Sequence, residues 1–118
     1  MPNAILLTLD QLPQDHPMPL IARRRVIGDR MMISEVVLSP GFEVPVHAHE
    51  NEQLVVMLRG HAEFDLVEEG VTRTIDVRTG QVLVLPAGTP HGCRAVDECL
   101  ILDLFSPVSE ATGVDRRA

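Results

Sequence analysis

The chain has no tryptophan and no tyrosine, and it has only three phenylalanines in 118 residues. Hydrophobic residues nevertheless make up 45% of the sequence, mostly as valine, leucine and isoleucine. This share is typical of a packed domain, and the length suits one domain rather than two. We therefore expect a single domain with an aliphatic core.

Basic residues and long apolar runs are also scarce. The chain has 10 Lys and Arg against 17 Asp and Glu, a net charge of −7. Nucleic-acid binding requires an excess of clustered basic side chains, so we expect no nucleic-acid partner. The basic cluster Arg23–Arg25 is more typical of a solvated strand face. No apolar run reaches the ~20 residues of a membrane span, and the first residues do not resemble a signal peptide, so we expect a cytoplasmic protein without a membrane partner.

Only two cysteines are present, Cys93 and Cys99. Their spacing matches no zinc knuckle or redox motif. In a cytoplasmic protein we expect them to be reduced thiols of the core. A disulfide across a hairpin is the less favoured alternative.

Short apolar runs alternate with turns that contain glycine and proline. Runs of this length and spacing predict an all-β sandwich or barrel. The expected strands are 31–38, 53–59, 62–67, 71–77, 81–86, 92–96 and 99–105. The expected organisation is an N-terminal arm packing on the barrel (1–30), the barrel itself (31–106) and a C-terminal tail (107–118).

Several of these strands are apolar on both faces. In 53–59, Leu54 and Val56 alternate with Val55 and Met57. Successive side chains of a strand point to opposite faces, so such a strand needs an interior on one side and a second sheet or a partner subunit on the other. A small barrel that dimerises through one sheet satisfies both needs, and we expect a homodimer.

The stretch VPVHAHENEQLVVMLRG contains two histidines one residue apart. In a strand, side chains at i and i+2 lie on the same face about 6.6 Å apart, so His47 and His49 can converge on one ion. Gln53 follows the expected turn HENE and can return to the same interior. His91, after the tight turn PAGTP, is a fourth candidate ligand.

Two stretches resemble the signature motifs of the cupins. GFEVPVHAHENEQLVVMLRG resembles the first motif, with the HxH pair, an acid or amide and two flanking glycines at the expected spacing. GQVLVLPAGTPHGCRA resembles the second, with Ala95 in place of the usual asparagine. The resemblance implies an all-β double-stranded β-helix (jelly-roll) barrel. It also implies a divalent transition metal, such as Zn, Ni, Fe or Mn, with four ligands: His47, His49, Gln53 and His91.

Glutamine is a neutral ligand at a position where cupins often have glutamate. Three imidazoles and an amide leave the charge of a divalent ion uncompensated, which strengthens it as a Lewis acid and favours a small anionic substrate. The set also departs from the two-histidine, one-carboxylate triad of oxygen-activating iron. Strand alternation turns the neighbouring Glu52 away from the Gln53 face. The alternative is a metal-free barrel whose histidines bind a ligand directly.

The flanking segments ARRRVIGDRMMISEVVLSPG and CLILDLFSPVSE resemble the small pectin-degradation (KdgF-like) cupins, which convert unsaturated uronates into linear keto acids. That resemblance implies catalytic roles for Asp103 and Phe105 near the barrel mouth. The family also has an arginine four residues beyond the phenylalanine, where this chain has Ser109.

Asp103 has two interpretations at this point. A carboxylate that faces a barrel interior is expensive to bury without a partner, so it can form a structural ion pair with an arginine of the 23–25 cluster. Alternatively, it acts as a general acid or base toward a metal-bound substrate.

The leading hypothesis is a metal-dependent lyase or isomerase that acts on a small carboxylated sugar or keto acid. One alternative is a metal-dependent dioxygenase of the quercetinase or small-thiol type. Another is a non-catalytic barrel that binds a small ligand.

Overall fold

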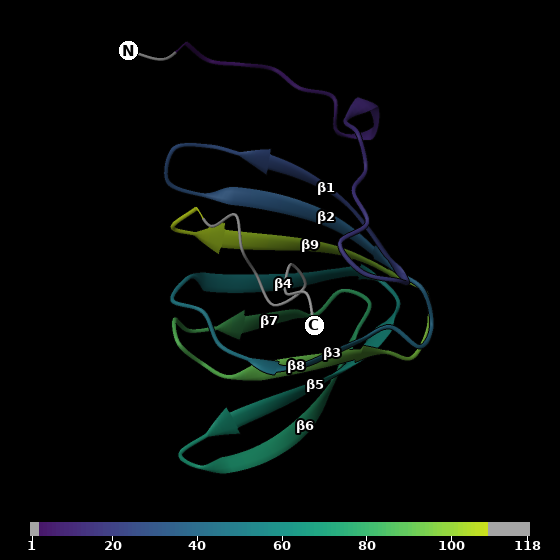
Figure 1. Ribbon diagram of the computed structural model, residues 1–118, viewed down its shortest axis with the longest axis vertical. Coiled ribbons are helices and arrows are strands. Elements are labelled where there is room, and N and C mark those ends of the chain that lie inside the picture. The colour runs from purple at the N-terminus through teal and green to yellow at the C-terminus, as the bar shows by residue number, and fades with distance from the viewer. Residues whose placement is uncertain (1–2, 109–118) are drawn as a thin grey trace.

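The structure describes residues 3–108, and within this range the computed structural model contains a short 3-10 helix, η1 (Leu9–Gln11), and nine β-strands. The strands are β1 (Ile21–Ile27), β2 (Met32–Leu38), β3 (Glu43–His47), β4 (Glu52–Arg59), β5 (His61–Glu68), β6 (Val71–Arg78), β7 (Val82–Leu85), β8 (His91–Ala95) and β9 (Cys99–Ser106). They form a five-stranded sheet, β1-β2-β9-β4-β7, and a four-stranded sheet, β3-β8-β5-β6 (Figure 1). Neighbouring strands are antiparallel throughout. The predicted all-β jelly-roll architecture is confirmed.

The core lies between the two sheets and follows strand alternation. On β4, Val55 and Met57 are 1% and 0% exposed, whereas Leu58 is 44% exposed. The inward-facing side chains of both sheets form one cluster, and it is mainly aliphatic. All three phenylalanines of the chain, Phe42, Phe64 and Phe105, are also buried. The aliphatic core predicted from composition is confirmed.

Two strands, β1 and β3, were not among the predicted strand ranges, although strand geometry was assumed for His47 and His49. β1 lies inside the segment that the sequence predicted as an arm, and it pairs with β2 along its whole length. Its three consecutive arginines conceal the alternation that marks a half-buried strand. β3 contains Pro45, which is compatible with a strand here because β3 lies at an edge of its sheet. Ser109 and the rest of the predicted tail beyond residue 108 lie outside the described residues.

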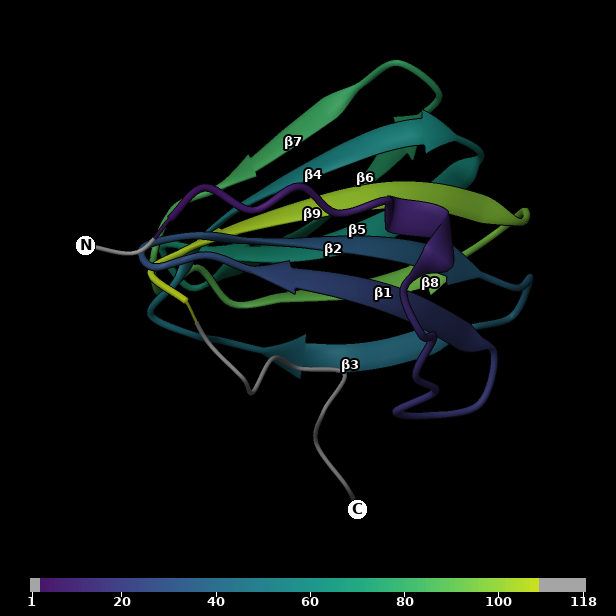
Figure 2. The same ribbon diagram turned by 90° about the horizontal axis from the view of Figure 1, so that it is seen from above.

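The segment before β1 is fastened to that strand. Asp15 and Arg23 exchange two backbone hydrogen bonds of 2.9 and 3.0 Å. The Nε of Arg24 donates to the carbonyl oxygen of Leu12 at 2.9 Å. Figure 1 and Figure 2 show η1 and residues 3–8 outside the sheets, beyond β1. The arm is therefore anchored through residues 12–16.

Cys93 and Cys99 are buried free thiols, as predicted. Burial raises the pKa of both side chains, which keeps them protonated at neutral pH. No helix among residues 3–108 is long and apolar enough to cross a membrane.

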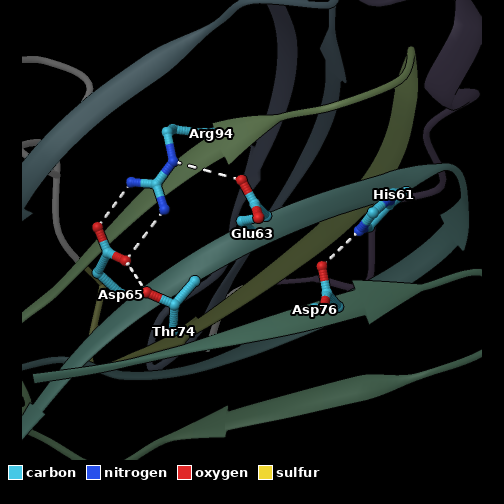
Figure 3. Close-up of polar contacts among 6 residues, drawn as sticks. All are labelled: His61, Glu63, Asp65, Thr74, Asp76 and Arg94. Carbon is cyan, nitrogen blue, oxygen red and sulfur yellow. Dashed lines mark hydrogen bonds and ion pairs between the residues drawn. The ribbon is translucent and has the colours of Figure 1, made fainter.

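The outer face of the four-stranded sheet carries a charged network (Figure 3). Arg94 on β8 donates to both carboxylate oxygens of Asp65 on β5, at 2.7 and 3.1 Å, and lies 3.5 Å from Glu63. Thr74 on β6 donates to Asp65 at 2.6 Å. The hydrogen bonds from Arg94 lower the pKa of Asp65 from 3.8 to about 2, with Thr74 contributing. Three strands of this sheet are thus joined by side chains that face water.

We expect Asp65→Asn to lower the free energy of unfolding at pH 6 by about 1 kcal/mol, as for a partly exposed ion pair. The folded pKa of Asp65 lies below its ordinary value, so this stabilisation is complete above pH 3.8 and is lost as the pH falls through 2. Urea unfolding should show a difference between wild type and variant at pH 6 that disappears near pH 2. Asp29→Asn, at an exposed aspartate, is the control. A difference that is constant with pH contradicts the assignment.

Candidate metal centre

Two histidines meet across the junction of β3 and β8. His47 ends β3, His91 begins β8, and their Cα atoms are directly paired. The register of the pair shifts between Val44 and His47, which re-aims the end of β3. The ring centroids of the two histidines lie 4.5 Å apart.

His49 lies in the loop after β3 rather than on the strand. Strand alternation, which predicted that His47 and His49 share a face, therefore does not by itself explain their approach. The loop brings the His49 ring to centroid distances of 5.8 Å from His47 and 5.1 Å from His91. One ring nitrogen from each histidine lies within 4.8 Å of the other two. Ligands of one ion at about 2.1 Å are at most about 4.2 Å apart, so a small contraction closes the site.

The histidine tautomers follow from the backbone. Nδ1 of His47 lies 2.9 Å from the carbonyl oxygen of Pro45, that of His49 lies 3.0 Å from Asn51, and that of His91 lies 2.8 Å from Thr89. A carbonyl oxygen only accepts, so each Nδ1 carries the proton. In the neutral ring, Nε2 then holds the lone pair, and backbone carbonyls commonly orient metal-binding histidines in this way.

Burial also keeps His91 neutral. It lowers the pKa of His91 from 6.5 to about 4, and the charges of His47 and His49 act in the same direction, whereas the hydrogen bond to Thr89 opposes them. A neutral imidazole is the form that binds a metal ion. At neutral pH, His91 is ready to donate its lone pair.

Gln53, at the start of β4, is 6% exposed and faces the same interior, whereas Glu52 is exposed, as strand alternation predicted. Nε2 of Gln53 donates to Oδ1 of Asp103 at 3.0 Å. This hydrogen bond turns Oε1 of Gln53 toward Nε2 of His49, which lies 3.1 Å away. When His49 is neutral, the lone pair on its Nε2 faces a lone pair on Oε1 of Gln53. A cation beside both atoms, or a second proton on His49, removes this repulsion. The donor set therefore fits a divalent ion.

Asp103 and Phe105 lie on β9 and line the pocket that the histidines and Gln53 also line. Burial raises the pKa of Asp103 from 3.8 to about 7, against the hydrogen bond from Gln53. The ring of Phe105 packs edge-on against His49, with centroids 5.8 Å apart. Asp103 thus contacts the amide of Gln53, and Phe105 contacts the imidazole of His49.

Sequence reasoning allowed one arginine of the 23–25 cluster as a partner of Asp103, but it did not predict that Arg23 and Arg25 on β1 both line the pocket. The cluster was interpreted as a solvated strand face, yet Arg23 is 4% exposed. The signal that could have revealed their inward orientation is strand alternation from Ile21, because residues 21, 23 and 25 share one face. Ile21 is also buried and lines the pocket. Arg23 forms an ion pair with Asp15, and the hydrogen bond of Asp103 comes from Gln53.

Residues 34–105, more than half of the chain, match the cupin domain family, so the chain belongs to the cupins. KdgF from Halomonas sp. is a similar solved structure, with a TM-score of 0.79, 26% sequence identity, and coverage of 92% of this chain and 97% of that one. Oxalate decarboxylase OxdC of Bacillus subtilis (DEL162-163 mutant) has a TM-score of 0.80 at 21% identity, covers 90% of this chain and 30% of that one, and shows the fold alone.

Among curated proteins, the chain is similar to the 3-hydroxyanthranilate 3,4-dioxygenase of Cupriavidus pinatubonensis, with 28% identity over 92 residues. This match covers 75% of this chain and 49% of the relative. The enzyme of the same name from Paraburkholderia phytofirmans is 26% identical over 100 residues, which cover 82% of this chain and 58% of the relative. The chain thus spans about half the length of the curated relatives it matches.

We expect the metal-free protein to bind one divalent transition ion, with Ni²⁺ and Zn²⁺ as probes in calorimetric titrations. A free metal concentration 100 times Kd should stabilise the fold by about 2.7 kcal/mol, and a chelator should reverse this. His49→Ala and His91→Ala should each weaken binding by more than about 100-fold, because each removes a ligand rather than its orienting partner. His61→Ala, whose ring faces Asp76 on the outer surface, should bind as wild type does. Unchanged affinity in both site variants contradicts the assignment.

Proposed function

We propose that this cupin is a metal-dependent lyase or isomerase that converts a small unsaturated uronate into a linear keto acid. The observation that carries the proposal is the contact between Asp103 and Gln53 in the pocket that the three histidines line. The contact places a carboxylate beside an amide whose oxygen is aimed at His49. A group that can move a proton is thereby held next to the metal centre.

The proposed ligands are His47, His49, His91 and Gln53. The orientation of the amide supports Gln53 as a metal ligand, because its Nε2 donates to Asp103 and its Oε1 is directed to His49. A neutral amide adds no charge to the centre. The ion would act as a Lewis acid that polarises a substrate oxygen. Its uncompensated charge favours an anionic substrate.

The reaction needs only a transfer of protons within the substrate. When the anomeric hydroxyl loses its proton, the bond between C1 and the ring oxygen breaks and C1 becomes an aldehyde. The ring oxygen becomes that of an enolate at C5, and a proton delivered to C4 converts the enolate into a ketone. One proton leaves and one is added, so composition and charge do not change. In the proposal Asp103 accepts the first proton and delivers the second.

Phe105 has a supporting part in this proposal. It is 4% exposed and packs against the edge of the His49 ring. It shapes the pocket wall and limits rotation of that imidazole. The similarity to KdgF from Halomonas sp., which extends over nearly the full length of both chains, supports the uronate assignment.

A metal-dependent dioxygenase is the second candidate, favoured by the similarity to the two 3-hydroxyanthranilate 3,4-dioxygenases. Oxygen uptake that depends on added Fe²⁺ and on 3-hydroxyanthranilate would support it. We rank the dioxygenase second because the neutral Gln53 stands where oxygen-activating iron sites have a carboxylate ligand.

We expect the metal-loaded protein to remove the ultraviolet absorbance of unsaturated galacturonate, because the conjugated double bond is lost. Asp103→Asn should lower the rate by about 100-fold or more, since the amide cannot carry the proton. Asp29→Asn, which removes an exposed aspartate, should leave the rate unchanged. No turnover by wild-type protein with any of its candidate metals would eliminate the uronate reaction.

We also propose that the protein works as a homodimer through the outer face of the five-stranded sheet. Apart from the ion pair of Arg24 and Glu35, this face is mainly apolar, in contrast to the charged outer face of the other sheet in Figure 3. Its outward-facing side chains include Ile33, Val37, Leu54, Val56, Val82, Val84, Leu100, Leu102 and Leu104. Over β7, β4 and β9 these side chains form a continuous apolar patch, and such a patch marks an interaction surface.

Light scattering after gel filtration should give about twice the 13.0 kDa of one chain. Val56→Arg should yield a folded monomer, because Val56 lies between Val82 and Leu102 on this face and a buried guanidinium without a partner is costly. Thr72→Arg, on the exposed outer surface of the other sheet, should remain dimeric. A wild-type monomer at micromolar concentration would contradict the dimer.

A further inference from the structure

The inward face of β1 brings two arginines to the pocket wall. Arg23 and Arg25 line the pocket together with Ser34, Asp103 and the metal-binding residues. Arg24 lies between them and points to the outer face, where its Nη1 lies 3.2 Å from Glu35 and its Nε donates to Leu12. Arg24 thus fastens the arm from the outside of the sheet, and Arg23 and Arg25 bind Asp15 of the same arm from the inside.

Arg23 is held in a fixed orientation. Its Nε and Nη2 donate to the two carboxylate oxygens of Asp15, at 2.9 and 3.1 Å. Nη2 of Arg25 lies 3.4 Å from Oδ2 of the same carboxylate. The backbone bridge between Asp15 and Arg23 fixes the position of that carboxylate. A single aspartate therefore positions two guanidinium groups.

These cations are placed across the sheet from the group that moves the proton. Arg25 is paired with Ser34, and Ser34 is paired with Asp103, so the three residues form one row across β1, β2 and β9. All three line the pocket, and Ser34 is only 3% exposed. A ligand that reaches from the histidines along this row meets the guanidinium groups at its other end.

We propose that Arg23 and Arg25 form an anion-binding subsite that holds the carboxylate of the ligand in this pocket, with Asp15 as the positioning residue. The identity of that ligand as a carboxylated sugar rests on the proposed function. Asp15 supplies one negative charge for the two guanidinium groups, and an anionic ligand supplies a second. Guanidinium groups match the planar geometry of a carboxylate and form strong charge-assisted hydrogen bonds with it.

The subsite should discriminate between an acid and a neutral sugar of the same size. D-Galacturonate is a suitable probe because it has the carboxylate but no double bond, so the proposed isomerisation does not consume it. D-Galactose carries a CH₂OH group in place of the carboxylate. Kd values for both sugars can be measured on Zn²⁺-loaded protein by NMR titration, since zinc is diamagnetic.

We expect wild type to prefer galacturonate to galactose, and Arg25→Gln to reduce this preference by about tenfold or more, as for loss of a hydrogen bond to a charged group. Arg23→Gln should do the same. If that variant does not fold, because Arg23 is buried, Arg25→Gln carries the test. Arg24→Gln is the matched control and should keep the wild-type preference, because Arg24 faces outward.

Asp15→Asn tests the positioning role. It should weaken galacturonate binding while galactose binding stays the same, whereas a merely structural role would change both. A wild-type preference that survives in Arg25→Gln and Asp15→Asn overturns the subsite, because the carboxylate then binds elsewhere. If unsaturated galacturonate is not turned over but the preference depends on Arg25, the proposed function fails and the subsite stands.

Discussion

The three hydrogen bonds from imidazole Nδ1 atoms to backbone carbonyls are the constraint on which the centre depends. Each carbonyl fixes one tautomer and one ring orientation, so three lone pairs are directed to the same small region. These carbonyls belong to backbone within two residues of each histidine, where β3 ends and β8 begins. The geometry is therefore set by the backbone before any ion or ligand arrives, and little reorganisation is required on binding.

The same pocket combines an aliphatic interior with a few buried polar groups. Gln53 links the histidines to Asp103, and Asp103 lies in one row with Ser34 and Arg25. The apolar surroundings raise the pKa of Asp103 and lower that of His91 for the same reason: burial disfavours the charged form of each. Polar groups are costly in such an interior unless they are paired, and groups with perturbed pKa values of this kind cluster at functional sites in proteins.

Much of the fold was predictable, because strand alternation and turn residues are local signals. The predicted strands correspond to β2 and β4 to β9, and the inward orientation of Gln53, Asp103 and Phe105 follows from their positions on β4 and β9. β1 was missed because three consecutive arginines hide its period. His49 was expected on a strand, yet it lies in the loop after β3, and no local pattern encodes how that loop folds back.

By itself, the sequence determined the jelly-roll class, the aliphatic core and the four side chains that are candidates for a metal, since motif spacing and periodicity are properties of the chain alone. Only the tertiary structure decided which atoms of those side chains face one another. It also showed that Arg23 faces the interior and that Asp15, from the segment before β1, orients it. Such contacts join residues that are distant along the chain or lie in irregular segments, and their geometry exists only once the sheets have packed.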